Sequence, residues 1–390
     1  MGSRWLILAV LFLARTTMGF QFQSVGTLSP FLVRELGIDY TQLGLLIGCY
    51  LLPGVVIAYP GGLLGQRLGD KHVAILGMTL MVAGGVLTGA SHDYAAFLAG
   101  RLISGIGAVL LNVILTKMAT DWFVGREIGT ALALLVSSWP IGIGIALVVL
   151  PWLAAASSTT TAFVTTAVAA ALVLVMVAAV YRGPATNAPA SAPAGGLGFG
   201  LSALEFGLVS LAGIVWALFN VGYIIVVSFT PSLLIAQGIS AAEAGLATSL
   251  ASWTLIPTIA LGGMLLDRIR HATALMITSF AVLGLSILAL PSVSSLALIA
   301  FIGAVTGLPA GAMVALPAEV LRPQNRAPGM GIFFTWYYVG MALLTPVAGL
   351  LRDLTGDPGA PIIFAGVLEV AAIAVIGLLR LLQRRYRLRP

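Results

Sequence analysis

The sequence predicts an all-α integral membrane protein with twelve transmembrane helices in two pseudo-symmetric six-helix bundles. Its 390 residues are 59% hydrophobic and 8% charged, with a mean hydropathy of +1.08, and such a chain cannot cover a water-soluble surface. Apolar runs of about 20 residues, enough for a helix to cross a hydrocarbon core of about 30 Å, recur along its length. These runs are continuous in Ala, Leu, Ile, Val and Gly, whereas a barrel strand alternates apolar and polar residues.

Each expected span has room for about 20 helical residues. In chain order the spans are 5–26, 41–64, 73–91, 95–117, 128–152, 160–181, 205–233, 242–265, 272–290, 295–317, 329–350 and 360–382. The first run is too long for the core of a signal peptide, so we expect it to be retained as a helix. The single cysteine, Cys49, excludes an intrachain disulfide framework and a thiolate metal cluster.

The distribution of the 19 Lys and Arg residues predicts the orientation. With a cytoplasmic N-terminus, fifteen of them fall on the cytoplasmic side, only Arg34 and Arg352 fall outside, and Arg15 and Arg101 lie within spans. This asymmetry predicts a multi-pass protein of the bacterial cytoplasmic (inner) membrane with both termini in the cytoplasm. The net charge of +6 then reflects topology and affinity for the lipid bilayer's anionic headgroups, so nucleic-acid binding is not expected.

A stretch rich in Pro, Ala and Gly divides the chain. Residues 182–202 read RGPATNAPASAPAGGLGFGLS, which predicts a flexible cytoplasmic linker (182–203) between a first bundle, 1–181, and a second, 204–390. Residues of one type recur in both bundles at an offset of 201, namely Pro30 and Pro231, Gly37 and Gly238, Gly44 and Gly245, Gly61 and Gly262, Gly62 and Gly263, and Arg67 and Arg268. Parallel repeats of this kind place two similar bundles face to face around an axis along the membrane normal.

One junction occurs at corresponding points of the two bundles: residues 61–71 read GGLLGQRLGDK and residues 262–271 read GGMLLDRIRH. Because Gly62 and Gly263 lack a Cβ, we expect a helix of the other bundle to approach closely there. Arg67 and Arg268 can pair with acidic groups or with carbonyls at a helix C-terminus, where the macrodipole is negative. Such a pairing would latch the cytoplasmic side in one state only. The alternative is that these cations merely follow the positive-inside rule.

The first junction resembles the loop signature of the major facilitator superfamily. Matching positions in the two copies are Gly62, Leu64, Arg67, Gly69 and Lys71, and then Gly263, Asp267 and Arg268. Two positions of the first copy depart from the pattern, since Gln66 stands where the family usually has Asp and Asp70 where it usually has a cation. We therefore expect the stronger gating effect at Asp267 and Arg268.

Two further motifs resemble the same superfamily. RLISGIG, with Arg101, is similar to the Arg-x-x-x-Gly-x-Gly pattern of the fourth helix, and SSWPIGIGIA partly matches the fifth-helix pattern. The resemblance covers the whole chain, and the subfamily expected is the bacterial branch of cyanate and nitroimidazole permease-like proteins. It implies a transporter that works by alternating access, as a monomer without a cofactor, and it associates the position of Arg101 with proton coupling. An equally open alternative for Arg101 is hydrogen bonding to neighbouring helix backbones.

Polar and aromatic residues inside the spans are the candidate substrate contacts. An arginine at mid-span costs about 2.5 to 3.5 kcal/mol on insertion scales, so Arg15 should face a cavity or a partner. Helical spacing places Arg15 on a face with Gly19 and Phe22, and the resemblance sets that span beside the cavity. The full set of expected contacts is Arg15, Gly19, Phe22, Asn112, Trp139, Trp216, Asn220, Tyr223, Trp336 and Tyr337. Packing in the core is the alternative for each aromatic residue, and neutralisation by backbone carbonyls is the alternative for Arg15.

The expected gating and coupling residues are those of the two junctions together with two charged groups inside spans. They are Gly62, Arg67, Gly69, Asp70, Arg101, Gly263, Asp267, Arg268 and Glu369. Glu369 is the acidic residue that lies deepest in a span, and we favour a structural partner for it over a role as a proton carrier, because the resemblance makes its helix peripheral.

The charges on the four spans expected to line the cavity predict the substrate. They hold two embedded cations, Arg15 and Arg101, and no acidic residue away from the span ends. An uncompensated cation in a low-dielectric cavity attracts anions, so we expect a small organic or inorganic anion, moved together with a proton. The alternatives are a drug/proton antiporter that exports neutral or amphipathic compounds and a membrane-embedded receptor without transport.

Enzyme motifs are missing from the sequence. The three histidines have no zinc-protease spacing and there is no GxxxxGK[ST] phosphate loop. We therefore expect neither an enzyme nor a metal site.

Overall fold

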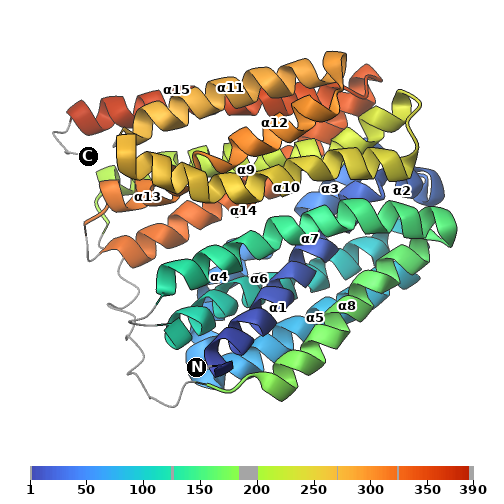
Figure 1. Ribbon diagram of the computed structural model, residues 1–390, viewed down its shortest axis with the longest axis horizontal. Helices are drawn as coiled ribbons and strands as arrows, with labels where there is room; N and C mark the ends of the chain where they lie inside the picture. The colour runs from blue at the N-terminus through green and yellow to red at the C-terminus, as the bar shows by residue number, and fades with distance from the viewer. Residues whose placement is uncertain (1, 124–126, 184–200, 270, 323–324, 386–390) are drawn as a thin grey trace.

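The computed structural model describes residues 2–123, 127–183, 201–269, 271–322 and 325–385. Its secondary structure in these ranges is helical (Figure 1). The helices are α1 (Gly2–Thr27), α2 (Ser29–Leu36), α3 (Tyr40–Gly48), α4 (Gly54–Leu68), α5 (Asp70–Ala90), α6 (Tyr94–Phe123), α7 (Ile128–Ala156), α8 (Thr159–Val180), α9 (Ala203–Ala236), α10 (Ala241–Ile269), α11 (Ala272–Val293), α12 (Leu296–Gly307), α13 (Ala310–Val320), α14 (Arg326–Thr355) and α15 (Ala360–Arg385).

The all-α membrane fold with twelve spans is confirmed. Eleven segments of the described ranges are long and apolar enough to cross a membrane. The remaining crossing, expected at 41–64 as one helix, is made by α3 and α4 together. Its helix is interrupted at 49–53, where the amides of Leu51 and Leu52 both turn back to the carbonyl of Gly48 and where Pro53 has no N–H to continue the ladder.

A second expected helix is also interrupted. The span 295–317 divides into α12 and α13, because α12 ends at Gly307 and Pro309 begins a new turn before α13. Both interruptions fall at a Gly and Pro pair within an apolar run, so hydropathy alone did not separate them from continuous helices.

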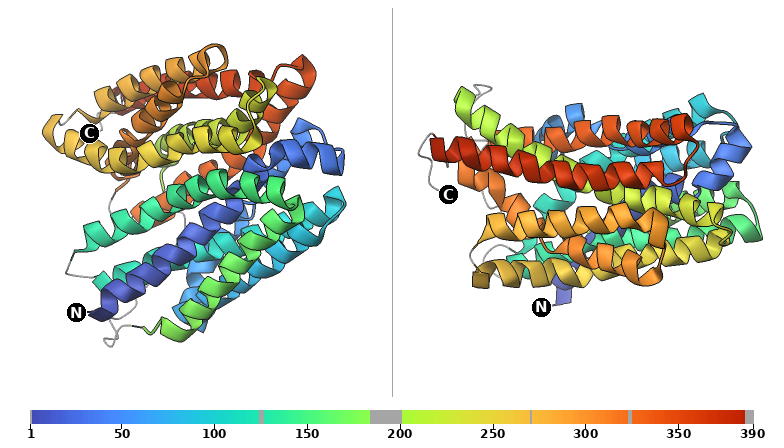
Figure 2. Two further views of the ribbon diagram at one scale, coloured as in Figure 1. Left: turned by 45° about the vertical axis from the view of Figure 1, so that its right-hand side comes forward. Right: turned by 90° about the horizontal axis from the view of Figure 1, so that it is seen from above.

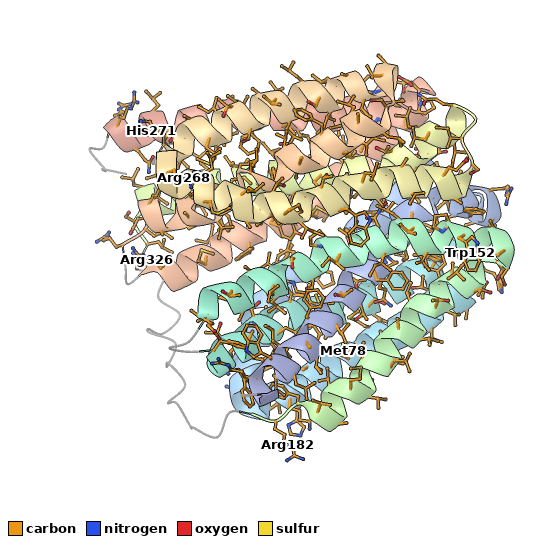
Figure 3. The ribbon with its side chains drawn as sticks, in the orientation of Figure 1. Met78, Trp152, Arg182, Arg268, His271 and Arg326 are labelled. Atoms are coloured by element: carbon orange, nitrogen blue, oxygen red, sulfur yellow. The ribbon has the colours of Figure 1, made fainter. Side chains whose placement is uncertain are left out.

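The helices form two halves, α1 to α8 and α9 to α15, which lie side by side with their long axes roughly aligned (Figure 1). Both chain termini lie at the same end of the molecule, which we call the terminal end; Arg182, Arg268 and Arg326 also project there (Figure 3). Trp152 lies at the opposite end, which we call the far end. The predicted linker, 182–203, lies mostly outside the described residues.

The two halves meet closely at the far end, where α3 packs against α14. A Cβ added to Gly44 would lie 2.3 Å from the carbonyl oxygen of Thr345, and one added to Gly349 would collide with the backbone of Tyr40. The hydroxyl of Thr345 donates to the carbonyl of Gly44 at 3.0 Å. Small residues four apart thus bring the two backbones into contact, as small-xxx-small motifs do in membranes.

A matching contact joins α7 to α10. A Cβ added to Gly245 would lie 2.2 Å from the carbonyl oxygen of Leu147, and Gly144 packs against the ring of Trp253. Gly44 and Gly245 are the pair that the 201-residue repeat relates. The repeat therefore places one close contact on each side of the interface between the two halves, which we call the seam. Toward the terminal end the ribbons of the two halves diverge (Figure 2).

The seam gives a first test. We predict that Gly44→Leu lowers the free energy of unfolding by about 1 to 3 kcal/mol, because the added side chain must separate α3 from α14. The measurement is the thermal unfolding midpoint in detergent. Gly207→Leu is the matched control, since a side chain at Gly207 meets open space. Equal unfolding midpoints for the two variants would contradict the prediction that close packing at Gly44 stabilises the fold.

Candidate functional site

Arg15 lies at mid-length of α1 and reaches toward the other half. Its guanidinium lies close enough to the phenol groups of Tyr337 and Tyr338 on α14 to interact with them electrostatically. The side chain of Asn112 on α6 lies beside the Tyr338 hydroxyl. Residues from both halves therefore meet around Arg15, and three of them, Arg15, Asn112 and Tyr337, are expected substrate contacts. We call the four residues the Arg15 cluster.

The charge of Arg15 has no counter-ion within the described residues. Its Nε is buried and has no hydrogen-bond partner, and the ion pairs of the described ranges involve other cations. A buried charge without a partner is costly. The Arg15 cluster is thus suited to receive an anion, and a planar guanidinium can hold a carboxylate through two parallel hydrogen bonds.

Tyr338 also packs against the point where the second span is interrupted. A Cβ added to Gly54, the first residue of α4, would lie 2.5 Å from the Tyr338 ring. The ring from the second half therefore occupies space that a side chain at this point would fill. The break between α3 and α4 places the start of α4 directly against the Arg15 cluster.

Aromatic residues gather between α9 and α14 in the second half. The Trp216 ring stacks on Phe333 with centroids 5.8 Å apart, and its Nε1 is buried without a partner. The Trp336 side chain packs on Gly213. Asn220 donates its Nδ2 to the carbonyl of Trp216 at 2.8 Å. None of these expected contacts hydrogen bonds to Arg15 in the described ranges.

Tyr223, the repeat partner of Phe22, faces into its own half. Its hydroxyl lies 2.9 Å from Oγ of Ser252 on α10, and the side chain is buried. The role of Tyr223 as a substrate contact therefore stays a prediction.

Three other expected contacts pack inside the first half. A Cβ added to Gly19 would lie 2.4 Å from the carbonyl oxygen of Trp139, so Gly19 serves the close packing of α1 on α7. Phe22 is 1% exposed and lies between Trp139 and Tyr50, with ring centroids 5.3 and 5.6 Å away. In this conformation Phe22 and Trp139 fit the packing alternative, and the substrate role of all three residues stays a prediction.

Arg101 is held by backbone carbonyls. Its Nε donates to Leu46 at 3.1 Å, and its two terminal nitrogens donate to Gln21 and Phe22 at 3.0 Å each. The guanidinium also lies 4.4 Å from the centroid of the Tyr50 ring. Leu46 is in the last turn of α3, where the helix dipole favours a cation. All these partners belong to the first half, so the geometry fits the structural alternative for Arg101.

Sequence reasoning missed two glutamines in α1. Gln21 accepts from the hydroxyl of Tyr50 and donates to the carbonyl of Met81, and Gln23 donates across the seam to the carbonyl of Val227 at 3.0 Å. The signal was present, because FQFQS places two amides inside an apolar span, where a polar side chain needs a partner.

The first loop junction is anchored within its own half. Gly69, with φ +82°, ends α4 and precedes α5, a backbone conformation that glycine adopts without strain. Asp70 accepts from Nζ of Lys117 at 2.6 Å, and Lys117 also donates to Asp121. Asp70, which departs from the family pattern, therefore ties the loop to the end of α6. Arg67 is exposed, and among the described residues it forms no ion pair.

The second junction corrects one expectation. A side chain at Gly263 would meet open space, whereas one at Gly262 would lie 2.2 Å from the carbonyl oxygen of Leu308. Neighbouring residues of a helix point about 100° apart, so only Gly262 faces a neighbouring backbone, that of the turn between α12 and α13 in the same half. Arg268 is exposed. The contacts of Gly62 and of the Asp267 side chain lie outside the described part of the structure.

Glu369 corrects another expectation, since no partner for it is found in the described ranges. It is 0% exposed, and neither carboxyl oxygen has a hydrogen-bond partner. Oε1 faces Gly222 of α9, where an added Cβ would lie 2.3 Å away. The absence of a side chain at Gly222 thus makes room for the carboxyl group between α15 and α9.

A polar contact that the sequence did not indicate closes the far end. The carboxylate of Asp353 on α14 accepts from the amides of Tyr40 and Thr41 at 2.9 and 2.7 Å and from the Thr41 hydroxyl at 2.6 Å. These are the first two residues of α3, so Asp353 caps a helix of the other half. Beside it, the Arg352 guanidinium lies 3.6 Å from the centroid of the Tyr40 ring. We call this contact the far-end clamp.

Twelve spans in two halves, with a cluster of side chains from both halves around one embedded cation, define a multi-pass membrane transporter. The family model described as Major Facilitator Superfamily matches residues 11–239 and 211–390. The chain therefore belongs to this superfamily, as the loop signatures indicated. These findings do not resolve the cyanate and nitroimidazole permease-like branch, which stays an expectation.

Comparisons with individual proteins point the same way. The chain is 27% identical to the 3-(3-hydroxy-phenyl)propionate transporter of Escherichia coli (strain K12), over 99% of this chain and 96% of the relative. It is 26% identical to the quinolone resistance protein NorA of Staphylococcus aureus over 26% of each chain. The inward open structure of the xylose transporter XylE from E. coli superposes with a TM-score of 0.79, at 14% identity and 96% coverage of both chains. The first and the third are transporters by name, which agrees with the expectation that the chain is not an enzyme.

Arg101 gives a second test. We predict that Arg101→Lys lowers the free energy of unfolding by about 2 to 4 kcal/mol, because one ammonium group cannot reach three carbonyls on two helices. Thermal unfolding in detergent measures the loss, with Arg34→Lys, at an exposed position of α2, as the control. If both variants unfold like the wild type, the carbonyl contacts do not support the fold.

Proposed function

We propose that this transporter moves a small organic anion across the bacterial cytoplasmic membrane by alternating access, coupled to protons. The observation that carries the proposal is the Arg15 cluster, in which an embedded guanidinium with no counter-ion among the described residues lies between the two halves. A carboxylate can bind this guanidinium in two parallel hydrogen bonds. Asn112 and the phenol of Tyr337 add hydrogen-bonding groups beside it.

The body of the substrate is proposed to be aromatic. Tyr337 and Tyr338 lie with ring centroids 5.1 Å apart next to Arg15, and aromatic rings favour offset or edge contacts with other rings. The full-length relative is by name a transporter of an aromatic carboxylate, 3-(3-hydroxy-phenyl)propionate. The same combination of charge and ring would suit the cluster in this chain.

Alternating access is proposed to depend on two opposing contacts. The far-end clamp and the glycine seam close one end in the conformation described here, while Arg67 and Arg268 at the terminal end are exposed. We propose that the loop cations pair with the other half only when the terminal end closes. A contact made in one state and lost in the other shifts the balance between the states.

The terminal end is proposed to face the cytoplasm. Fifteen of the 19 Lys and Arg residues belong to this side by the positive-inside rule, and Arg182, Arg268 and Arg326 project from it (Figure 3). The conformation described here would then be the inward-facing one.

Proton coupling is supported by Glu369. It is a fully buried carboxyl group without a partner among the described residues, and ionisable groups inside a membrane often serve proton pathways. Import and export both fit this arrangement, and acidification or alkalinisation of proteoliposomes during uptake measures the direction of proton flow.

One alternative is export of neutral or amphipathic compounds in exchange for protons. The partial match to the quinolone resistance protein NorA favours it, but the Arg15 guanidinium, which has no counter-ion among the described residues, favours an anion over a neutral compound.

The substrate's charge gives a third test. We predict that organic anions, above all aromatic carboxylates, raise the thermal unfolding midpoint of the wild type and that Arg15→Ala abolishes the shift. The loss of a charge-assisted pair corresponds to a tenfold or greater rise in Kd. Neutral compounds and lipophilic cations serve as comparison ligands, and Arg34→Ala is the control. Stabilisation by a cation, or by an anion regardless of Arg15, would refute the proposal.

The far-end clamp and the proposed pairing of the loop cations give a fourth test, which uses one cysteine as the reporter. Ser228 is 1% exposed and lies against Gly26 of the other half, so Ser228→Cys in a Cys49→Ser background reports opening of the far end. We predict that Asp353→Ala raises the rate of labelling by an impermeant maleimide outside intact cells about fivefold, because a lost helix cap is worth about 1 kcal/mol. Arg67→Ala should lower the rate, because it removes the latch of the opposite state.

Matched controls separate gating from general charge effects. Asp357→Ala removes an acidic residue at the same end whose side chain accepts a hydrogen bond from its own loop and none from α3 among the described residues, and Lys71→Ala removes another cation of the first junction. Equal labelling rates for the Asp353 and Asp357 variants would refute the proposal that the far-end clamp holds this end closed. An unchanged labelling rate for Arg67→Ala would mean that Arg67 only follows the positive-inside rule. Labelling only from inside the cell would contradict the proposed cytoplasmic position of the terminal end.

A further inference from the structure

A shallow groove lies away from the seam, between α11 and α15 at the terminal end. Its walls come from the first turns of α11 and the last turns of α15. They consist of Thr273, Ile277, Gly377, Arg380, Leu381, Gln383 and Arg384. The floor at Gly377 is open, since an added Cβ would meet nothing within 4 Å.

The polar groups of this groove include two buried hydrogen-bond donors that have no partner among the described residues. Gln383 is 2% exposed, and its carbonyl oxygen accepts from a terminal nitrogen of Arg380 at 2.7 Å. This bond fixes the amide, so that the Nε2 group is the end left free, and it has no partner. The Nε of Arg380 is likewise buried without a partner. A group that accepts hydrogen bonds would satisfy both donors.

The charge of the groove is positive. Arg380 is paired with Glu319 of α13 at 2.5 Å, so its charge is largely balanced. Arg384 is exposed at the rim, and among the described residues it forms no ion pair. The net charge and the free donors together select an anion.

The rest of the groove is apolar and faces away from the bundle. Leu381 is 63% exposed and its neighbour Leu378 is 46% exposed, which suits contact with lipid chains. Under the proposed orientation, this surface lies at the depth of the cytoplasmic headgroups. Basic pockets between helices on that side of a membrane are suited to phosphate headgroups.

We propose that this groove binds an anionic phospholipid, with its phosphate at Gln383, Arg380 and Arg384 and its glycerol and upper chains along Gly377, Ile277 and Leu381. The bound lipid joins α11 to α15 on the outer face of the second half. The site is separate from the Arg15 cluster, so it rests on the proposed orientation but not on the proposed substrate.

The test is lipid binding by the full-length protein in detergent, measured by native mass spectrometry. The probes are phosphatidylglycerol and phosphatidylcholine with identical eight-carbon chains, and inorganic phosphate alone. We expect wild-type protein to bind phosphatidylglycerol about tenfold more tightly than phosphatidylcholine. Gly377→Leu, which fills the open floor, should remove this preference, while Gly207→Leu, at another open glycine near a helix end of the same half, should keep it.

Arg384→Ala is a second variant that leaves the packing intact, and it should reduce the preference severalfold. Equal binding of the two lipids by the wild type, or a preference that survives both Gly377→Leu and Arg384→Ala, would overturn the proposal. Competition by inorganic phosphate as strong as that by the lipid would overturn the assignment to a phospholipid. None of these outcomes depends on transport, so they test the lipid site and leave the proposed substrate to its own experiment.

Discussion

Direct contact between backbones at the far end is the constraint on which the rest of the structure depends. Helices in a membrane gain nothing from hiding apolar side chains, so two halves adhere where their main chains come close enough for dispersion and hydrogen bonding. Gly44 and Gly245 supply that closeness on the two sides of the seam. Because the halves meet at this end, they diverge at the other (Figure 2), and the Arg15 cluster lies between the contact and the divergence.

Two embedded arginines show how differently one residue type is used in the membrane. Arg101 donates hydrogen bonds to backbone carbonyls of α1 and α3, and these bonds stabilise the first half alone. Arg15 keeps its Nε without a partner at the boundary of the two halves. A satisfied charge holds a fold together, whereas an unsatisfied charge favours whatever ligand completes it. This contrast, rather than the presence of a cation, distinguishes the proposed substrate contact from the structural one.

Sequence reasoning predicted the number of spans, the two halves and the family, because hydropathy and repeated glycines leave a strong pattern. It also singled out Arg15, Asn112 and Tyr337, since polar and aromatic groups are rare in apolar runs. It missed the interruption at 49–53, because Gly and Pro also occur inside continuous membrane helices. It missed Asp353 as a clamp, because only the fold brings residue 353 beside residue 41.

The corrected expectations for Gly263 and Glu369 have a common physical origin. Sequence places Gly262 and Gly263 together, but the helix turns them toward different neighbours, and only one meets a backbone. Glu369 was expected to have a structural partner because its helix is peripheral, yet among the described residues its carboxyl group faces the space left by the missing side chain of Gly222. Such details depend on the rotation of each helix about its axis, which hydropathy does not determine.

The interruption of the second span has a mechanical meaning. Above the break, α3 is attached to α14 through Gly44 and Asp353, while below it α4 continues into the loop anchored on α6 by Asp70. One crossing of the membrane is therefore attached at one end to the second half and at the other end to the first, with the turn at 49–53 between the two attachments.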